Sequence, residues 1–196
     1  VFTTIPSCVP AAPGLEDAGA VIGPQEIKEA MRWEGVVALG EMMNFPGVLN
    51  NDPRTWSILA ETMEAGKTIT GHYALPETAK GLPAYAAAGI SSCHESTRAE
   101  DALAKLRLGM YAQLREGSAW HDIKETIKVI TEGKVDSRLC QLVTDDTHPQ
   151  TLIECGHLNH VVRRAIEEGV TPVEAIQMAT LNTAQYYGMA DKLGSI

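Results

Sequence analysis

The sequence lacks several features that would place it in a specialised class of protein. No run approaches the ~20 apolar residues of a membrane-spanning helix, and no signal peptide opens the chain. Positive charge is scarce, because 16 lysine and arginine residues face 25 acidic residues, which gives a net charge of −9. An acidic chain of this kind is not expected to bind nucleic acid or an anionic membrane surface.

Cysteine is too sparse to define the fold. The four cysteines are far apart in the sequence and show no paired spacing; they are Cys8, Cys93, Cys140 and Cys155. They predict free thiols in a cytoplasmic protein rather than a disulfide framework or a four-cysteine zinc site. The sequence also has no Gly-x-Gly-x-x-Gly or P-loop motif, which argues against a nucleotide-binding protein with a doubly wound sheet.

What the sequence does contain is a regular alternation of short apolar runs with longer helical segments. Strands are predicted at residues 1–5, 36–39, 68–72, 90–95, 110–114 and 139–143. Helices are predicted at residues 25–33, 53–65, 82–88, 99–108, 123–131, 158–168 and 172–181. This order predicts an α/β fold with a parallel sheet of right-handed βαβ units. Periodicity alone does not separate a closed barrel from an open sheet.

Four polar residues follow directly after strand-like runs: Glu41, His72, His94 and Asp145. In parallel α/β folds the carboxyl ends of the strands form one face, so we expect residues far apart in sequence to meet there. Imidazole and carboxylate groups are the ligands that hold a hydrolytic zinc, iron or manganese ion. A single histidine at a strand end is usually structural, but four such residues in successive units predict a metal site.

These residues lie in motifs that resemble the adenine deaminase family. The motifs occur in order over essentially the whole chain, at residues 40–47, 71–72, 93–95, 105–110, 115–119 and 144–149. The segment at residues 178–182, Met-Ala-Thr-Leu-Asn, is similar to one found widely in amidohydrolases. The first and last of the deaminase motifs, Gly-Glu-Met-Met-Asn-Phe-Pro-Gly and Thr-Asp-Asp-Thr-His-Pro, are the most specific.

The resemblance implies that residues 1–196 are part of a (β/α)₈ catalytic barrel, covering about strands 3 to 8. The chain is shorter than the roughly 250 residues of a complete barrel. It starts inside an apolar run at Val1 without an initiator methionine, so we expect it to be a segment of a longer protein. The first strands, with the family's His-x-His metal pair, and the family's C-terminal domain are missing from this sequence.

The same resemblance implies a centre of two divalent metal ions, manganese, iron or zinc. Glu41 would bridge the two ions, His72 and His94 would bind one of them, and Asp145 would bind the other. Bound metal lowers the pKa of water towards about 7 and so supplies hydroxide, which would attack C6 of the purine. Asp145 would take the proton and return it to the departing ammonia. An acidic residue is expected where Cys93 stands.

Further residues near these strand ends are candidates for contact with the substrate. Glu95 is a second catalytic candidate, and Asp146 is the alternative to Asp145 if the register shifts by one residue. Either Met42 or Met43 should line the pocket, while the other packs into the barrel wall. The predicted substrate contacts are Met43, Asn44, Arg115, Ser118, Asp146 and His148, with Glu116 considered beside them. Surface or structural roles are the alternative for each, as they are for Cys8, His121, His157 and His160.

The expected activity is the metal-dependent hydrolysis of adenine to hypoxanthine and ammonia in purine salvage. We expect a cytoplasmic homo-oligomer whose ligand is a small purine, with no nucleic acid or membrane partner. The nearest alternative is an amidohydrolase for another aminopurine or cyclic amidine. An inactive barrel paralogue with a binding role is the alternative from another class, although the four intact candidate ligands count against it.

Overall fold

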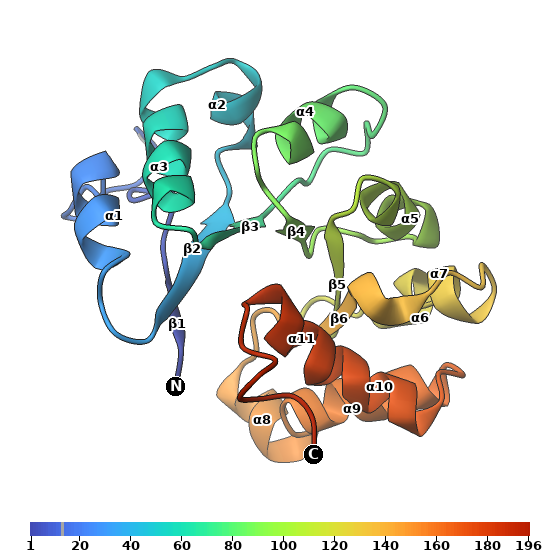
Figure 1. Cartoon of the computed structure of the whole chain (residues 1–196). Coiled ribbons are helices and arrows are strands. Elements are labelled where there is room, and N and C mark those ends of the chain that lie inside the picture. Colours follow the sequence, from blue (N-terminus) through green and yellow to red (C-terminus); the bar gives the residue numbers. More distant parts are fainter. Residues whose placement is uncertain (13) are drawn as a thin grey trace. The chain divides into compact units, whose positions relative to one another are not determined.

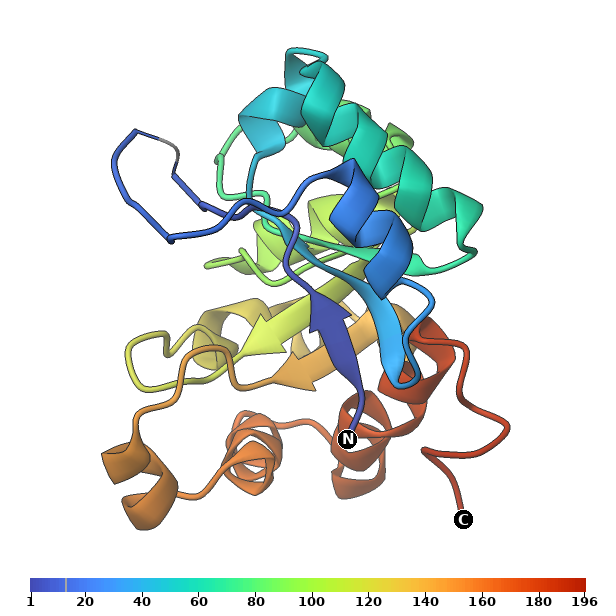
Figure 2. The same cartoon turned by 90° about the vertical axis from the view of Figure 1, so that its left-hand side faces the viewer.

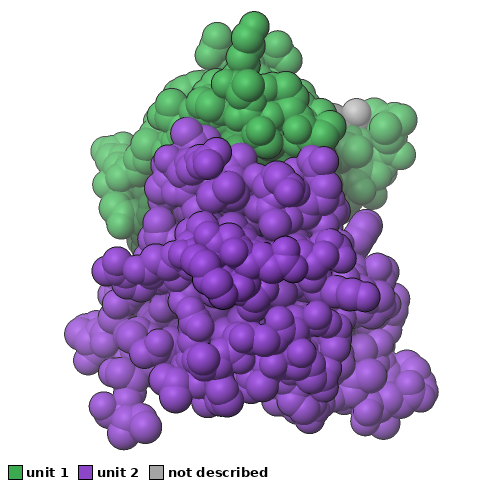
Figure 3. Space-filling model, turned by 90° about the vertical axis from the view of Figure 1, so that its right-hand side faces the viewer, with its two compact units in different colours: residues 1–93 green, residues 94–196 purple. Residues whose placement is uncertain are grey.

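Short runs of β-branched and apolar residues form the strands of the computed structural model, and amphipathic segments between them form the helices (Figure 1). The structure describes residues 1–12 and 14–196. By its internal contacts the chain divides into two units, Val1–Cys93 and His94–Ile196 (Figure 3). Strands pair in parallel and alternate with helices in both units, which confirms the predicted α/β class.

The first unit contains a parallel sheet of three strands. In sheet order these are β1 (Thr3–Ile5), β2 (Val36–Met42) and β3 (Thr68–Gly71), and the short β4 (Ser92–Cys93) follows in the chain. Leu39 of β2 lies level with Ile5 of β1 and with Ile69 of β3. Because the strands are parallel, their carboxyl ends meet at one edge of the sheet.

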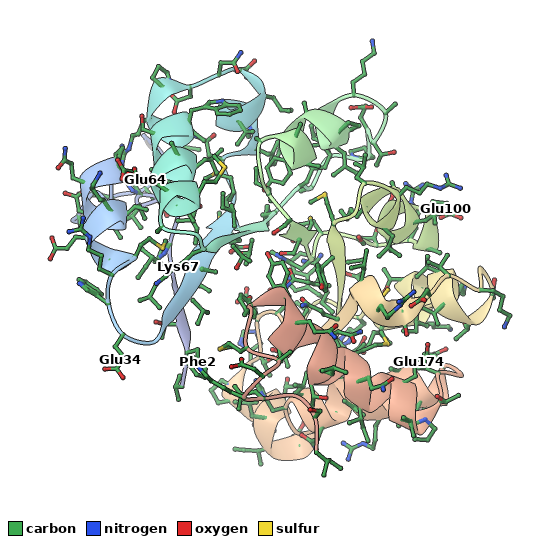
Figure 4. The ribbon with its side chains drawn as sticks, viewed as in Figure 1. Phe2, Glu34, Glu64, Lys67, Glu100 and Glu174 are labelled. Atoms are coloured by element: carbon green, nitrogen blue, oxygen red, sulfur yellow. The ribbon has the colours of Figure 1, made fainter. Side chains whose placement is uncertain are left out.

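The helices of this unit are α1 (Pro24–Ala30), α2 (Phe45–Leu49), α3 (Pro53–Glu64) and α4 (Gly81–Ala87). Helices α1 and α3 pack side by side (Figures 1 and 2), and Lys28 of α1 pairs with Glu61 of α3 at 3.0 Å. Asp52 caps the start of helix α3, because its carboxylate accepts the Thr55 N–H at 2.8 Å. Lys67, labelled in Figure 4, donates from the start of β3 to the Val36 carbonyl of β2.

The second unit is built on two parallel strands, β5 (Tyr111–Arg115) and β6 (Cys140–Val143). A 3₁₀ turn, η1 (Ser137–Leu139), directly precedes β6. Its helices are α5 (Ala99–Arg107), α6 (Ile123–Thr126), α7 (Lys128–Thr131), α8 (Pro149–Glu154), α9 (Leu158–Glu167), α10 (Pro172–Ala179) and α11 (Leu181–Tyr186). Ala112 and Leu114 of β5 belong to the apolar core that helices α9 and α10 help to form. Side chains alternate along a strand, so Gln113 and Arg115 lie on the opposite face.

A chain of buried amides connects the two strands of this unit with the helix that ends it. Gln113 donates to the Gln141 side-chain oxygen at 3.0 Å, and Gln141 donates to the Asn182 carbonyl at 3.4 Å. The Asn182 amide in turn donates to the Cys140 carbonyl at 2.8 Å and to the Ser137 carbonyl at 2.9 Å. The Met-Ala-Thr-Leu-Asn segment therefore satisfies backbone groups at the start of β6.

Most predicted elements are present, with differences that have local causes. The strand predicted at residues 90–95 is limited to Ser92–Cys93, because the chain turns at once and the Ser96 N–H donates to the His94 carbonyl at 2.9 Å. The helix predicted at residues 123–131 is two helices, α6 and α7, in a stretch rich in β-branched residues with low helix propensity. Helices α2, α8 and α11 were not predicted.

All four cysteines are free thiols, as predicted. None of the helices in residues 1–12 and 14–196 combines the length and the apolarity needed to span a bilayer.

Candidate functional site

In the first unit, the structure brings together the two predicted metal ligands that this unit contains. Glu41 is the penultimate residue of β2, and His72 follows β3 directly. Met42 lies level with Gly71 across the two strands, so both side chains emerge at the same end of the sheet. The Glu41 carboxylate oxygen Oε2 is 3.0 Å from Nδ1 of His72.

A buried tyrosine fixes the two strand ends that carry these residues. The Tyr85 hydroxyl accepts the backbone N–H of His72 at 2.9 Å and donates to the carbonyl of Met42 at 2.7 Å. Burial raises the pKa of Tyr85 well above its ordinary value, so the hydroxyl keeps the proton it donates. Gly71 is required beside it, because a Cβ there would lie 2.4 Å from the Ser92 carbonyl oxygen.

The loops after β1 and β2, together with helix α3, line an open-sided cavity of about 280 Å³, to which Cys8, Asn44 and Arg54 contribute. The Asn44 side chain caps α2, because its oxygen accepts the Gly47 N–H at 3.0 Å and its amide donates to Thr55 at 2.9 Å. Asn44 therefore shapes this wall as well as facing the cavity. Of the two neighbouring methionines, Met42 is fully buried and Met43 is half-buried.

In the second unit, His94, Glu95 and Asp145 form a cluster. Their possible ligand atoms all lie within 4.8 Å of one another, and Nε2 of His94 is 3.3 Å from Oε1 of Glu95. His94 and Glu95 begin this unit, and Asp145 follows β6, so residues separated by about fifty positions meet as the strand-end pattern predicts. Imidazole and carboxylate donors of this kind suit zinc, iron and manganese.

Arg115, the last residue of β5, joins the acidic residues of this cluster. Its Nη1 donates to Glu95 and, at 2.7 Å, to Asp145, and its Nε donates to Asp122 at 2.9 Å. The Trp120 ring covers the guanidinium at 4.6 Å. Burial lowers the pKa of Arg115, but the hydrogen bonds to the three carboxylates outweigh burial and raise it, so the side chain stays charged.

The backbone at Asp145 has an unusual conformation, with φ at +56°. Aspartate tolerates this left-handed region better than most residues, and its Oδ1 accepts the N–H of Asp146 at 2.7 Å. Asp145 points into the cluster while Asp146 is exposed, which favours Asp145 over Asp146 as the functional residue. Gly117 permits this loop arrangement, because a Cβ there would lie 2.5 Å from the Thr144 carbonyl oxygen.

In the part of the chain that the structure describes, the remaining polar candidates of this unit form no hydrogen bond or ion pair with His94, Glu95 or Asp145. Glu116 is buried and pairs with His121 at 3.1 Å and with Arg164 of α9 at 3.8 Å. The Ser118 hydroxyl accepts the His148 backbone N–H at 2.7 Å and therefore links the loops after β5 and β6. His148 itself is exposed, as is His157, and His160 is half-buried on α9.

Sequence reasoning missed several residues that organise the site: Tyr85, Lys105, Trp120 and Asp122. Tyr85 and Lys105 sit on predicted helices, where a polar group normally faces solvent. Lys105 is instead only 2 % exposed, and its ammonium donates to the Glu95 carbonyl and to the Ser96 hydroxyl. The one available signal was that Lys105 and Arg115 each open a motif that resembles the deaminase family.

The sequence profile of the Amidohydrolase family matches residues 2–196. The chain belongs to the amidohydrolase family. Amidohydrolases generally use divalent metal ions, and the imidazole and carboxylate donors described above fit such ions.

Two curated relatives of this amidohydrolase chain are adenine deaminases. The chain is 66% identical over 196 residues to the enzyme of Moorella thermoacetica and 61% identical over 195 residues to that of Clostridium botulinum. In both alignments 100% of the chain is covered but only 33% of the relative, so the chain spans about a third of their length.

A solved structure resembles the amidohydrolase chain in fold. It is the β-aspartyl dipeptidase of Fervidobacterium islandicum in complex with a β-Asp-Leu dipeptide, with a TM-score of 0.57 at 12% identity. The match covers 84% of this chain and 51% of the dipeptidase chain. Family membership and this likeness confirm the predicted fold class, an α/β fold of the (β/α)₈ barrel type.

Proposed function

We propose that the protein containing this chain is an adenine deaminase, which hydrolyses adenine to hypoxanthine and ammonia. The observation that carries the proposal is the cluster of His94, Glu95 and Asp145, a set of metal-type donors held beside a fixed arginine. High identity to two adenine deaminases over the whole chain supports the choice of substrate. Residues 1–196 are then a part of the catalytic barrel, and the first strands and a C-terminal domain lie outside it.

We propose Glu41, His72, His94 and Asp145 as ligands of two divalent ions, manganese, iron or zinc. The support is the type of donor and its placement directly at strand ends in each unit. Such ions would lower the pKa of water and so supply hydroxide near neutral pH. The remaining ligands, a His-x-His pair, would come from the part of the protein outside this chain.

The chain's own residues would then handle the protons and the purine. Asp145 accepts the proton that water loses and returns it to the amine that leaves C6, because its carboxylate stands at the strand end with one oxygen held by Arg115. Glu95 is held by the same arginine and would act beside it. The proposed purine contacts are residues of the loops after β2, β5 and β6: Met43, Asn44, Ser118, Asp146 and His148.

The finer assignments follow from the same proposal. We place the activity in purine salvage in the cytoplasm, with adenine as the small-molecule partner and a homo-oligomer as the assembly. A different aminopurine or cyclic amidine is the alternative substrate, and an inactive binding paralogue is the alternative function. The fixed proton-transfer residues favour an active enzyme, since a binding protein has no chemical use for them.

The experiment uses the full-length protein loaded separately with manganese, iron or zinc. Hypoxanthine formation is measured with adenine, which also releases ammonia, and with an N6-substituted adenine, which would release the substituted amine, and metal content is measured on the same samples. We expect turnover of adenine, and a loss of roughly 10²–10⁴-fold in kcat for Asp145→Asn but not for the matched Asp146→Asn. If no ammonia forms from adenine with any of the metals, the proposed function is wrong. If kcat falls for Asp146→Asn but stays normal for Asp145→Asn, the two aspartates exchange their proposed roles.

A further inference from the structure

Two buried cations of the second unit contact the same acidic residue from different elements. Lys105 of α5 reaches the backbone of Glu95, and Arg115 of β5 reaches its carboxylate. We propose that Lys105 and Arg115 form a clamp that fixes Glu95 relative to Asp145, and that both cations are positioning residues. The inference rests on the proposed function only where catalytic rates are used to test it.

The Arg115 side of the clamp is nearly saturated by protein contacts. A guanidinium has five N–H donors in a rigid plane. The contacts to Asp122, to Asp145 and to both oxygens of Glu95 engage four of them, and the Trp120 ring covers one face. With its side chain 2 % exposed, Arg115 is better suited to hold the two carboxylates than to read the edge of a purine.

The Lys105 side of the clamp is unusual for a lysine. Burial of an ammonium is costly, and lysine is almost never fully buried unless its charge is paired. Within the described residues, the hydrogen bonds of the Lys105 ammonium go to the uncharged oxygens of Glu95 and Ser96, the latter at 2.7 Å, while the Asp101 carboxylate on the same helix attracts its charge without a hydrogen bond. An apolar side chain would fill this place at lower cost, so the position is explained by what the ammonium holds.

The Lys105 ammonium holds the turn that carries His94 and Glu95 of the cluster. Residues 94–96 leave the strand region in a tight turn, in which the Ser96 N–H donates to the His94 carbonyl at 2.9 Å. Lys105 fixes the carbonyl at the centre of this turn, while Arg115 fixes the side chain of the same residue. Two anchors on one residue leave Glu95 little freedom, and through Arg115 its position is tied to that of Asp145.

The test compares rates in the full-length, metal-loaded protein. Lys105→Met removes the donor but keeps the length of the side chain, and we expect kcat for adenine to fall by about 10²-fold with little change in KM, the scale expected for a misplaced catalytic group. Lys105→Gln keeps an N–H donor and should recover part of that loss. The matched control is Lys128→Met, which removes a lysine of α7 whose side chain is 35 % exposed and pairs with Glu125, and it should keep the wild-type rate.

A double-mutant cycle separates positioning from a merely structural role. If Lys105 acts through Glu95, the Lys105→Met change should cost little more in a Glu95→Gln background, whereas an effect on stability alone would be the same in both backgrounds. Equal losses in the two backgrounds would overturn the clamp. If Lys105→Met does not fold, the milder Lys105→Gln serves in the same cycle, because Lys105 contacts Glu95 and Ser96 but not Asp145.

A crystal structure of Lys105→Met tests the clamp without any turnover. We expect the Glu95 carboxylate to leave Arg115 in this variant, and an unchanged Glu95–Arg115 contact would overturn the proposal. If the wild-type protein releases no ammonia from adenine, the proposed function fails, yet the position of Glu95 in this structure still decides the clamp.

Discussion

Replacement of Tyr85 by phenylalanine tests how the two strand ends of the first unit are held in place. The Tyr85 hydroxyl is the shared partner of two backbone groups, the carbonyl of Met42 and the N–H of His72. These groups belong to the ends of β2 and β3, next to Glu41 and His72. Phenylalanine keeps the ring and its packing against Tyr73, so the change removes the hydroxyl alone.

The expected cost can be worked out from the two contacts. Each buried backbone group left without its partner costs about 1–3 kcal/mol, and no cavity is created that adds to this sum. We therefore expect Tyr85→Phe to lower the free energy of unfolding by about 2–6 kcal/mol. Because the freed amide belongs to His72 itself, the imidazole loses its fixed position, and metal affinity should fall by about 10–100-fold, as for other changes behind a metal ligand.

The assay is guanidinium unfolding of the metal-free full-length protein, followed by tryptophan fluorescence, together with a calorimetric titration with metal. The control is Tyr111→Phe, because the Tyr111 hydroxyl has no recorded hydrogen bond to any residue in 1–12 or 14–196, and its ring packs against Tyr186. If Tyr85→Phe unfolds at the same denaturant concentration as the control and binds metal as well, the hydroxyl does not align these strand ends and the reasoning is wrong.

Two substitutions and one labelling experiment test other parts of the structure. Gly71→Ala places a methyl group 2.4 Å from the Ser92 carbonyl oxygen, and this overpacking should lower stability by about 1–3 kcal/mol, measured by denaturant unfolding. Glu41→Gln should leave the fold intact but prevent binding of two metals, so elemental analysis should find clearly fewer than two ions per subunit. Burial raises the pKa of Cys140 to about 12, so its thiol should resist iodoacetamide at pH 8 in the native protein and react only after unfolding; equal labelling by mass spectrometry in both states would contradict this.

The strand ends were predictable because their signal is local. An apolar run followed by a polar residue marks the carboxyl end of a parallel strand, and Glu41, His72 and Asp145 all occur at such ends in the structure. Because the strands are parallel, their ends meet, which brings Glu41 next to His72. The same arrangement lets Arg115 connect Glu95 with Asp145. The metal and substrate roles of these residues stay predictions.

The supporting contacts were not predictable, because they depend on tertiary packing. Nothing local in the sequence distinguishes Lys105, which is buried on α5, from Lys128, whose side chain on α7 is 35 % exposed. The hydroxyl of Tyr85 reaches back to a carbonyl 43 positions earlier, a pairing that no periodicity encodes. The conformation of Asp145 is likewise set by the close approach of the two loops that Gly117 allows.

The buried amide chain of the second unit constrains how this part of the sequence can change during evolution. Gln113 donates to the Gln141 oxygen across β5 and β6, and Gln141 donates onward to the Asn182 carbonyl. An apolar replacement of Gln113 alone leaves the Gln141 oxygen buried without its donor, whereas replacement of both by apolar residues of similar shape removes donor and acceptor together and gives up only the 3.4 Å bond to the Asn182 carbonyl, so it should cost less. A lineage can therefore leave this arrangement only by passing through a less stable intermediate, and homologous sequences should change the two glutamines together.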